Sequence, residues 1–288
     1  MSTPLVTIGL PVYNGEKYLA QALASLLAQS FTDFELIISD NGSSDGTGAI
    51  CEAFEKQDKR IRCFRQPNNR ESLWNFNFVL EQAQGKYFMW AAHDDLWDKD
   101  WIAALLRNFK DGASISFGHV VNIDEVGKTV RTYRTFDFSG NRLLRMVRFY
   151  MAEERNGKAN IIYGLHRTDM VKKLAFREYN NCSFGRDMHF VFDCLQHGNV
   201  RTDPSVFLYK RIPAEARRPC SPGRLISSGF LLNRLKFHIT YPFVASRGID
   251  KLILLLLFPL RYVKALIFNA GLIASRVVSR IYQGDTSL

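Results

Sequence analysis

The chain has 288 residues, enough for one large domain or for one domain with an appendage. Its composition, 47% hydrophobic and 23% charged, is that of a globular protein and excludes disordered and collagen-like chains. Five cysteines occur without a Cys-x-x-Cys pair, which predicts neither a disulfide scaffold nor a cysteine zinc site and indicates a reducing compartment. The first residues lack the basic and apolar stretches of a secretory signal peptide, so we expect the active part in the cytoplasm.

Charge is distributed unevenly along the chain. Residues 1–200 balance acidic against basic side chains, so the whole net charge of +10 lies in the C-terminal part. Such an asymmetry predicts an anionic partner for that part, either a membrane surface or a nucleic acid. Composition alone leaves both partners open.

The first hundred residues alternate between strand and helix patterns. Apolar, β-branched runs bounded by turn residues predict strands at 5–10, 34–39, 61–65 and 87–91. Apolar residues at helical spacing predict helices at 18–28, 47–57, 73–84 and 99–109. Alternating units of this kind form a mostly parallel sheet with helices on both faces, and ligands bind in the loops after the carboxyl ends of the strands.

The middle of the chain is less regular. Here we expect strands at 113–121, 160–166 and 200–209, helices at 139–151 and 187–196, and a turn around Gly127. These elements complete an α/β domain over residues 1–210. Residues 211–224, rich in proline and arginine, predict a linker or an active-site loop.

Residues 225–288 form a basic and apolar helical tail. Its apolar runs, 252–260 and 265–274, are shorter than the roughly 20 residues that span a bilayer. A helix lying in the membrane interface fits better, with its cations toward anionic headgroups. The cations concerned are Arg247, Lys251, Arg261, Lys264, Arg276 and Arg280. A buried helical pair or an oligomer interface is the alternative.

Polar loops follow the first two expected strands. The first is Pro11-Val12-Tyr13-Asn14, and the second runs from Ser39 to Thr47 and contains Asp40. A carboxylate at a strand end accepts the imide N–H of uracil or a ribose hydroxyl, and glycines let the chain turn sharply into the next helix. The alternative for Asp40 is a turn-forming or helix-capping residue.

The run Trp90-Ala91-Ala92-His93-Asp94-Asp95-Leu96-Trp97 directly follows the fourth strand. Adjacent carboxylates at a buried strand end are costly unless a cation neutralises them. Mg²⁺ and Mn²⁺ prefer carboxylate and phosphate oxygens. We therefore expect Asp95 to bind such an ion beside a diphosphate, with Asp94 near a sugar or ribose hydroxyl. Without this context a pair of aspartates is usually a turn.

Over residues 4–210 these motifs resemble the inverting family 2 glycosyltransferases, which have the GT-A fold, a Rossmann-like sheet flanked by helices. The resemblance rests on residues 6–14, on the run 29–47 and on His93-Asp94-Asp95. It implies that Asp95 binds the metal and that the donor-binding residues include Pro11, Tyr13, Asn14, Asp40 and Asp94. The metal motif departs from the usual Asp-x-Asp, and Asn69-Arg70-Glu71 replaces the common Asn-x-Gly, where Arg70 suits a phosphate contact.

Inverting transfer needs a base for the acceptor hydroxyl. In the family this base is an Asp at the start of a late helix, often in a Glu-Asp pair. The resemblance therefore implies Asp187 as the base, with Arg186 in place of the usual Glu, and a helix start keeps that Asp ionised. Simple helix capping is the alternative. We expect His189, Arg217 and Arg218 in the acceptor region.

These features together predict a metal-dependent inverting glycosyltransferase that uses Mn²⁺ or Mg²⁺. It moves a sugar from a nucleotide-diphosphate donor, a UDP-sugar, to a hydroxyl of a glycan or of a polyprenyl-diphosphate-linked acceptor, in polysaccharide or glycoconjugate assembly. We expect it at the cytoplasmic face of the inner membrane, with a homo-oligomer left open. No nucleic acid is expected, because the tail lacks aromatics interleaved with its cations for stacking on bases. The alternative is a non-catalytic membrane-associated binding protein with a relic nucleotide site.

Overall fold

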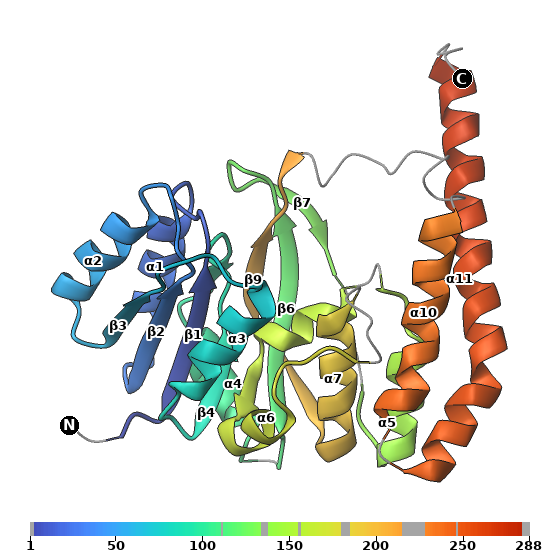
Figure 1. Cartoon of the computed structure of the whole chain (residues 1–288), viewed down its shortest axis with the longest axis horizontal. Coiled ribbons are helices and arrows are strands. Elements are labelled where there is room, and N and C mark those ends of the chain that lie inside the picture. The colour runs from blue at the N-terminus through green and yellow to red at the C-terminus, as the bar shows by residue number, and fades with distance from the viewer. Residues whose placement is uncertain are drawn as a thin grey trace.

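The computed structural model describes residues 3–110, 112–133, 138–154, 157–179, 185–214, 228–245 and 247–283. Over these residues a large sheet is covered by helices on both faces, and a pair of long helices packs beside it (Figure 1). The predicted α/β fold with a mostly parallel sheet is confirmed.

Nine strands make the sheet: β1 (Val6–Val12), β2 (Phe34–Asp40), β3 (Ile61–Arg65), β4 (Tyr87–Trp90), β5 (Leu96–Trp97), β6 (Ile115–Ile123), β7 (Thr129–Thr132), β8 (Leu165–Arg167) and β9 (Val200–Arg211). Their order is β3-β2-β1-β4-β8-β6-β9-β5, and β7 pairs with β6 outside this path. Strands β1 to β4 run parallel to one another, as do β6 and β9, whereas β5, β7 and β8 pair antiparallel with their neighbours.

The order of the first four strands places the ligand site. β1 and β2 are buried along their whole length, as expected of strands covered on both faces. The chain runs outward from β1 to β3 and then returns to β4 on the other side of β1. In open α/β sheets, ligands bind outside the carboxyl ends of the strands at such a reversal. The loops after β1, β2 and β4 meet there.

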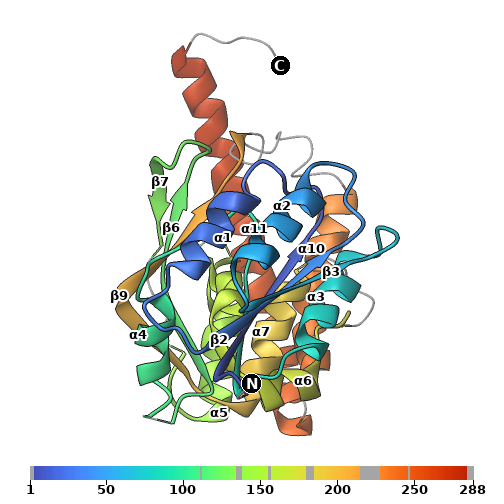
Figure 2. The ribbon, with the colours of Figure 1, turned by 90° about the vertical axis from the view of Figure 1, so that its left-hand side faces the viewer.

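Two sets of helices cover the sheet (Figure 2). One face carries α1 (Leu19–Leu27), α2 (Thr47–Gln57) and α4 (Trp101–Arg107), and the other carries α3 (Ser72–Glu81), α6 (Thr168–Leu174) and α7 (Arg186–His197). Gln29 joins α1 to α4, because its side-chain amide donates to Asp98 O at 2.7 Å and accepts from Ile102 N at 3.0 Å. On the opposite face, Trp90 of β4 donates to Phe76 O of α3 at 3.0 Å.

The strand expected at 160–166 is only partly present. Residues Lys158–Tyr163 form a short 3-10 helix, η2, and the strand is limited to β8. The fully buried Lys158 explains the helical turn, because its Nζ donates to Phe149 O at 2.8 Å and to Ala152 O at 3.0 Å. A short apolar run does not distinguish a strand from a buried helical segment.

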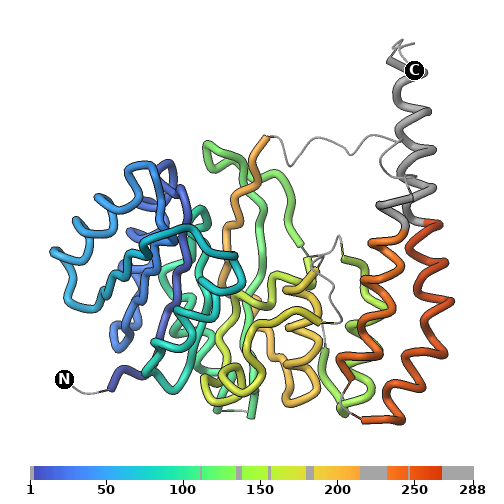
Figure 3. Tube along the Cα trace, in the orientation of Figure 1, coloured from blue at the N-terminus to red at the C-terminus, as the bar shows by residue number. Residues whose placement is uncertain are grey.

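The tail forms a helical hairpin of α10 (Ser228–Val244) and α11 (Gly248–Gln283), which packs on α7 and on α5 (Arg142–Met151). Figure 3 shows α5 and the hairpin side by side although about a hundred residues separate them. No helix within the described residues combines the length and hydropathy needed to cross a bilayer.

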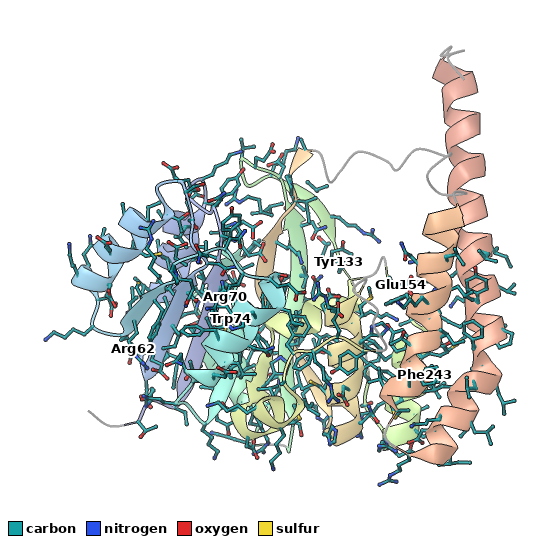
Figure 4. The ribbon with its side chains drawn as sticks, in the orientation of Figure 1. Arg62, Arg70, Trp74, Tyr133, Glu154 and Phe243 are labelled. Carbon is teal, nitrogen blue, oxygen red and sulfur yellow. The ribbon has the colours of Figure 1, made fainter. Side chains whose placement is uncertain are left out.

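Arg261 of α11 corrects one expectation for the tail. Its side chain is fully buried, so it does not face headgroups as predicted. The guanidinium pairs with Glu154, and Nε donates to Tyr150 O at 2.8 Å. Glu154 also pairs with Arg234 of α10 at 3.2 Å, and Figure 4 shows Glu154 beside the hairpin. A buried cation needs such partners, so this residue anchors the hairpin to the domain.

Candidate active site

The loop after β1 is held against the loop after β2. Asn14 has a positive φ of 50°, its backbone N–H donates to Ser43 Oγ at 2.9 Å, and its Oδ1 accepts from Ser44 N at 3.0 Å. Asn14 thus shapes the loop. Tyr13, with 43% of its surface exposed, offers a ring at the edge of the sheet, whereas Pro11 is buried within β1.

Asp40 ends β2 with its side chain almost fully buried. Its Oδ1 accepts from Ser43 N at 2.9 Å, and its Oδ2 lies 3.8 Å from Arg65 Nε. Oδ2 accepts no hydrogen bond from any residue that the structure describes. Since buried polar atoms are rarely left without a hydrogen-bond partner, Oδ2 is an acceptor suited to a ligand N–H or O–H.

Arg70 lies on the loop between β3 and α3. Its guanidinium stacks 4.3 Å from the ring centroid of Trp74, as Figure 4 shows, and its backbone N–H donates to Asn41 Oδ1 at 3.1 Å. Asn41 also donates to Arg70 O at 2.8 Å and to Asn69 Oδ1 at 2.9 Å. Asn41 thereby fixes the loop that carries Arg70 to the loop that carries Asp40. Within its polar loop Asn41 has no sequence feature that distinguishes it from its neighbours.

Asp95 is buried in the turn after β4, while Asp94 beside it is half-buried. Asp95 Oδ1 accepts from Arg211 N at 2.9 Å, and Asp95 Oδ2 has no hydrogen-bond partner among the described residues. Burial, chiefly, and the neighbouring Asp94 together raise the pKa of Asp95 to about 7, against the lowering effect of Lys210. A buried carboxylate oxygen without a partner fits a divalent cation, which would stabilise the ionised form.

The residues that the structure describes provide only part of such a metal site. The described residues contain no cluster of three or more His, Cys, Asp or Glu side chains that holds a metal. The adjacent carboxylates of Asp94 and Asp95 fit a cation whose remaining ligands come from a bound phosphate and from water, as is usual for Mg²⁺.

Arg211, expected at the start of a linker or an active-site loop, instead ends β9. Its Nε donates to Asp94 O at 3.0 Å, and its guanidinium also reaches Glu125 O at 2.8 Å and Gln21 Oε1 at 3.0 Å. Together with its backbone bond to Asp95, these contacts fix the carboxylate turn from the neighbouring strand.

Lys210, the residue before it, was also missed. The Lys210 side chain is half-buried, and its Nζ donates to Asn160 Oδ1 at 3.1 Å and lies 4.9 Å from the ring centroid of Tyr163. Burial lowers the pKa of Lys210, but Tyr163 and the carboxylates of Asp95, Asp187 and Asp94 outweigh burial, so the pKa is raised. The available signal was the pair of cations at the end of the last strand.

Asp187 lies in the first turn of α7, after Gly185 at a φ of 68°. Its Oδ1 accepts from Met188 N at 2.8 Å. Asp187, like Asp94 and Asp95, raises the pKa of Lys210. A pocket beside Asp187 is lined by Ser72, Leu73, Phe76, Ile162, Tyr163, Phe176 and Arg186. The predicted base thus borders a pocket together with Tyr163, whose ring Lys210 faces.

His189 is a correction to the expected acceptor region. Its side chain is fully buried, with Nε2 at 3.1 Å from Phe237 O and the ring 4.7 Å from that of Tyr241. Two residues along a helix turn through about 200°, so His189 points away from the side on which Asp187 lies. Arg217 and Arg218, also expected there, lie outside the described residues.

Comparisons with known proteins agree with this geometry. Residues 7–180 match the family described as Glycosyl transferase family 2. The chain is 30% identical over 203 residues to an uncharacterized glycosyltransferase of Haemophilus influenzae, covering 68% of this chain and 74% of that protein. It is 32% identical over 122 residues to the glycosyltransferase GlyG of Streptococcus pneumoniae, covering 42% of this chain and 40% of GlyG. It is also 39% identical over 97 residues to a putative teichuronic acid biosynthesis glycosyltransferase, TuaG, of Bacillus subtilis, covering 34% of this chain and 38% of TuaG.

Solved structures share the fold. TarS from S. aureus in complex with UDP superposes with a TM-score of 0.62 at 17% identity, covering 85% of this chain and 68% of that one. The mannosyltransferase PcManGT from Pyrobaculum calidifontis, in complex with GDP-Man and Mn²⁺, superposes with a TM-score of 0.56 at 15% identity, covering 99% of this chain and 83% of that one. The GT-A fold and the matched motifs show that the chain belongs to glycosyl transferase family 2.

Proposed function

We propose that the protein transfers a sugar from a UDP-sugar to an acceptor hydroxyl with inversion, in a metal-dependent reaction. The observation that carries this proposal is the unpartnered, buried Asp95 Oδ2 at the strand reversal, in one cluster with Asp94 and Asp187. Asp40 Oδ2, a buried carboxylate oxygen without a hydrogen-bond partner among the described residues, supports a nucleobase or ribose contact at the end of β2. Bound Mn²⁺ or Mg²⁺ would supply positive charge to the departing diphosphate.

The residues of the chain have separate tasks in this reaction. Asp95 and Asp94 would hold a cation at the diphosphate end of the donor, and Asp40 and Tyr13 hold the nucleoside end. Asp187 removes the proton from the acceptor hydroxyl as its oxygen attacks the anomeric carbon opposite the leaving diphosphate. The N-terminus of α7 favours the ionised carboxylate that a base requires.

The donor nucleotide is the first property to test. We would measure the thermal unfolding of the purified protein with UDP, GDP and dTDP, each with Mn²⁺ and with EDTA. A ligand present at 100 times its Kd adds about 2.7 kcal/mol to the free energy of unfolding, which shifts the midpoint measurably. We expect the largest shift with UDP and Mn²⁺.

Two variants make this experiment specific. Asp95→Ala should abolish the UDP shift. Asp100→Asn, a change to an exposed carboxylate five residues further on, should keep it. A larger shift with GDP would reassign the donor. The absence of any shift would contradict the donor site and favour a non-catalytic membrane-associated binding protein.

We further propose that the acceptor is a glycan or a polyprenyl-diphosphate-linked sugar at the cytoplasmic membrane face, reached through the α10–α11 hairpin. An exposed apolar stripe runs along α11 at intervals of three and four residues, formed by Ile249, Leu252, Leu256, Leu260, Val263 and Ile267. The exposed Arg247, Lys251 and Lys264 flank this stripe, and the sequence has no Asp or Glu from 251 to 283. Apolar and cationic side chains together suit an anionic lipid surface. The name of TuaG, a teichuronic acid biosynthesis relative, supports a role in polysaccharide assembly.

Vesicle flotation tests the membrane proposal. The protein should float with vesicles that contain anionic phosphatidylglycerol and much less with neutral phosphatidylcholine vesicles. The double variant Leu256→Glu and Leu260→Glu should stay unbound. If this variant binds vesicles as the wild type does, the membrane proposal is wrong. If the wild type is a stable dimer that the variant dissociates, the stripe is instead an interface between copies, and the membrane proposal is again wrong.

A further inference from the structure

Lys210 links the two halves of the proposed active site. Lys210 comes from β9, Asp94 and Asp95 follow β4, and Asp187 lies in the first turn of α7. Its Nζ is held by Asn160 Oδ1 at 3.1 Å and faces the ring of Tyr163. Tyr163, whose ring it faces, lines the same pocket as Asp187. β5 pairs antiparallel with β9 so that Leu96 lies opposite Tyr209, and Asp95 Oδ1 accepts from the N–H of Arg211, the residue after Lys210. All three carboxylates raise the pKa of the Lys210 ammonium.

The charges of this cluster do not balance. Three carboxylates act on the ammonium of Lys210, and the guanidinium of Arg211 also acts on Asp95, which leaves an excess of negative charge for a divalent cation to neutralise. The same ammonium repels such a cation, because buried charges act on one another more strongly than charges in water. A diphosphate reverses the situation, since its oxygens attract Lys210 and also supply metal ligands beyond those that the described residues offer.

We infer that Lys210 makes metal binding depend on the donor nucleotide: it weakens the binding of the free cation and favours the cation that arrives with a diphosphate. Lys210 is a positioning residue in this scheme, and the inference rests on the proposed metal-dependent donor site. Because coupling between two ligands is reciprocal, the metal strengthens nucleotide binding by the same factor.

Binding of Mn²⁺ alone tests the inference without any turnover. Free Mn²⁺ would be followed by electron paramagnetic resonance in titrations of the full chain, with and without UDP. Wild-type protein should bind Mn²⁺ alone weakly and bind it much more tightly with UDP. Lys210→Met should bind Mn²⁺ alone about tenfold or more tightly than wild type, because one opposing charge is gone, and UDP should add less.

Three further variants keep the result interpretable. Lys210→Gln retains a hydrogen-bond donor for Asn160 and is used if Lys210→Met fails to fold. It should also bind Mn²⁺ alone more tightly than wild type. Lys210→Arg keeps the charge and should bind like wild type. Lys172→Met removes a charge from α6, where Nζ donates to Ala83 O at 2.7 Å, and should leave Mn²⁺ binding unchanged.

The outcomes separate this inference from the proposed function. If wild type with UDP binds no Mn²⁺, or if Asp95→Asn binds it equally well, the donor site itself is wrong. If that site holds but Lys210→Met and Lys210→Gln bind Mn²⁺ alone no more tightly than wild type, the role given to Lys210 is overturned.

Discussion

Arg186 forms an ion pair with Glu71, and these are two positions at which the sequence departs from the family pattern. Glu71 stands where a glycine is common, and Arg186 stands where the residue before the base is often Glu. Arg186 also lies 3.7 Å from Glu178. The pair connects the loop that carries Arg70 with the helix that carries Asp187, so the two departures compensate each other in space.

Exchanging these charges tests the compensation. Arg186→Glu and Glu71→Arg should each lower kcat/KM, and the double variant should recover most of the loss. Because 60% of the Glu71 side chain is exposed, we expect a coupling free energy of only about 0.5–1 kcal/mol in a urea-unfolding double-mutant cycle. The Arg107–Asp203 pair, at 3.2 Å and away from the cluster, is the matched control and should leave kcat/KM unchanged. Additive single effects would show that the pair has no joint role.

Asp187→Asn tests the base. The amide cannot accept a proton, so kcat should fall by about 10²–10⁴, while the affinity for UDP and Mn²⁺ stays within about twofold of wild type. Asp169→Asn, in the first turn of α6, is a matched change at another helix start. Initial rates of UDP release measure kcat, and a wild-type rate for Asp187→Asn would exclude it as the base.

The acid stability of the fold should depend on His189. The pKa of His189 is lowered from an ordinary 6.5 to about 4, chiefly by burial and also by the nearby Lys158. The hydrogen bond to Phe237 O acts in the opposite direction. The unfolded chain therefore takes up the proton first as pH falls. The contribution of His189 is complete above pH 6.5 and is lost as pH falls toward 4.

Urea unfolding at these two pH values measures the effect. Between pH 6.5 and pH 4 the free energy of unfolding of wild type should fall by about 2–3 kcal/mol more than that of His189→Gln. His197→Gln, an exposed position on the same helix, should behave like wild type. If His189→Gln changes the KM for the acceptor and leaves the acid stability as in wild type, His189 belongs to the acceptor region after all.

The hairpin anchor should be sensitive to the loss of one buried charge. Arg261→Met leaves Glu154 with Arg234 alone and should lower the free energy of unfolding by about 3 kcal/mol. Lys264→Met, one turn away and 47% exposed, should cost less than about 1 kcal/mol although Lys264 also has an acidic partner, Glu153. Hydrogen exchange should increase in α10 and α11 of the first variant. Equal protection in both variants would show that Arg261 does not anchor the hairpin.

Local sequence patterns were sufficient to predict the parallel sheet and the candidate site residues that end its strands. The alternation of strand and helix patterns predicts the parallel sheet, and residues that end a strand, such as Asp40, lie at its carboxyl edge by topology alone. Asp95 was found in the same way, because a buried strand directly precedes it.

Residues brought in from distant parts of the chain could not be found this way. Arg211 contacts Asp95 across 116 positions, and its place in β9 is visible only once β6 and β9 are paired. Lys210 was missed for the same reason. Arg261 was misjudged because its partner Glu154 lies more than a hundred residues away, so the sequence shows only a cation in an apolar run.

The central claim is that Asp95 holds a cation that binds the donor diphosphate. Its most direct test is calorimetric titration of UDP into wild type and into Asp95→Asn, in Mn²⁺ and in EDTA. We predict that wild type binds UDP at least about tenfold more tightly in Mn²⁺ than in EDTA, and that Asp95→Asn shows the same weak binding in both. Equal affinity of wild type in Mn²⁺ and EDTA, or a full Mn²⁺ effect in Asp95→Asn, would contradict the account.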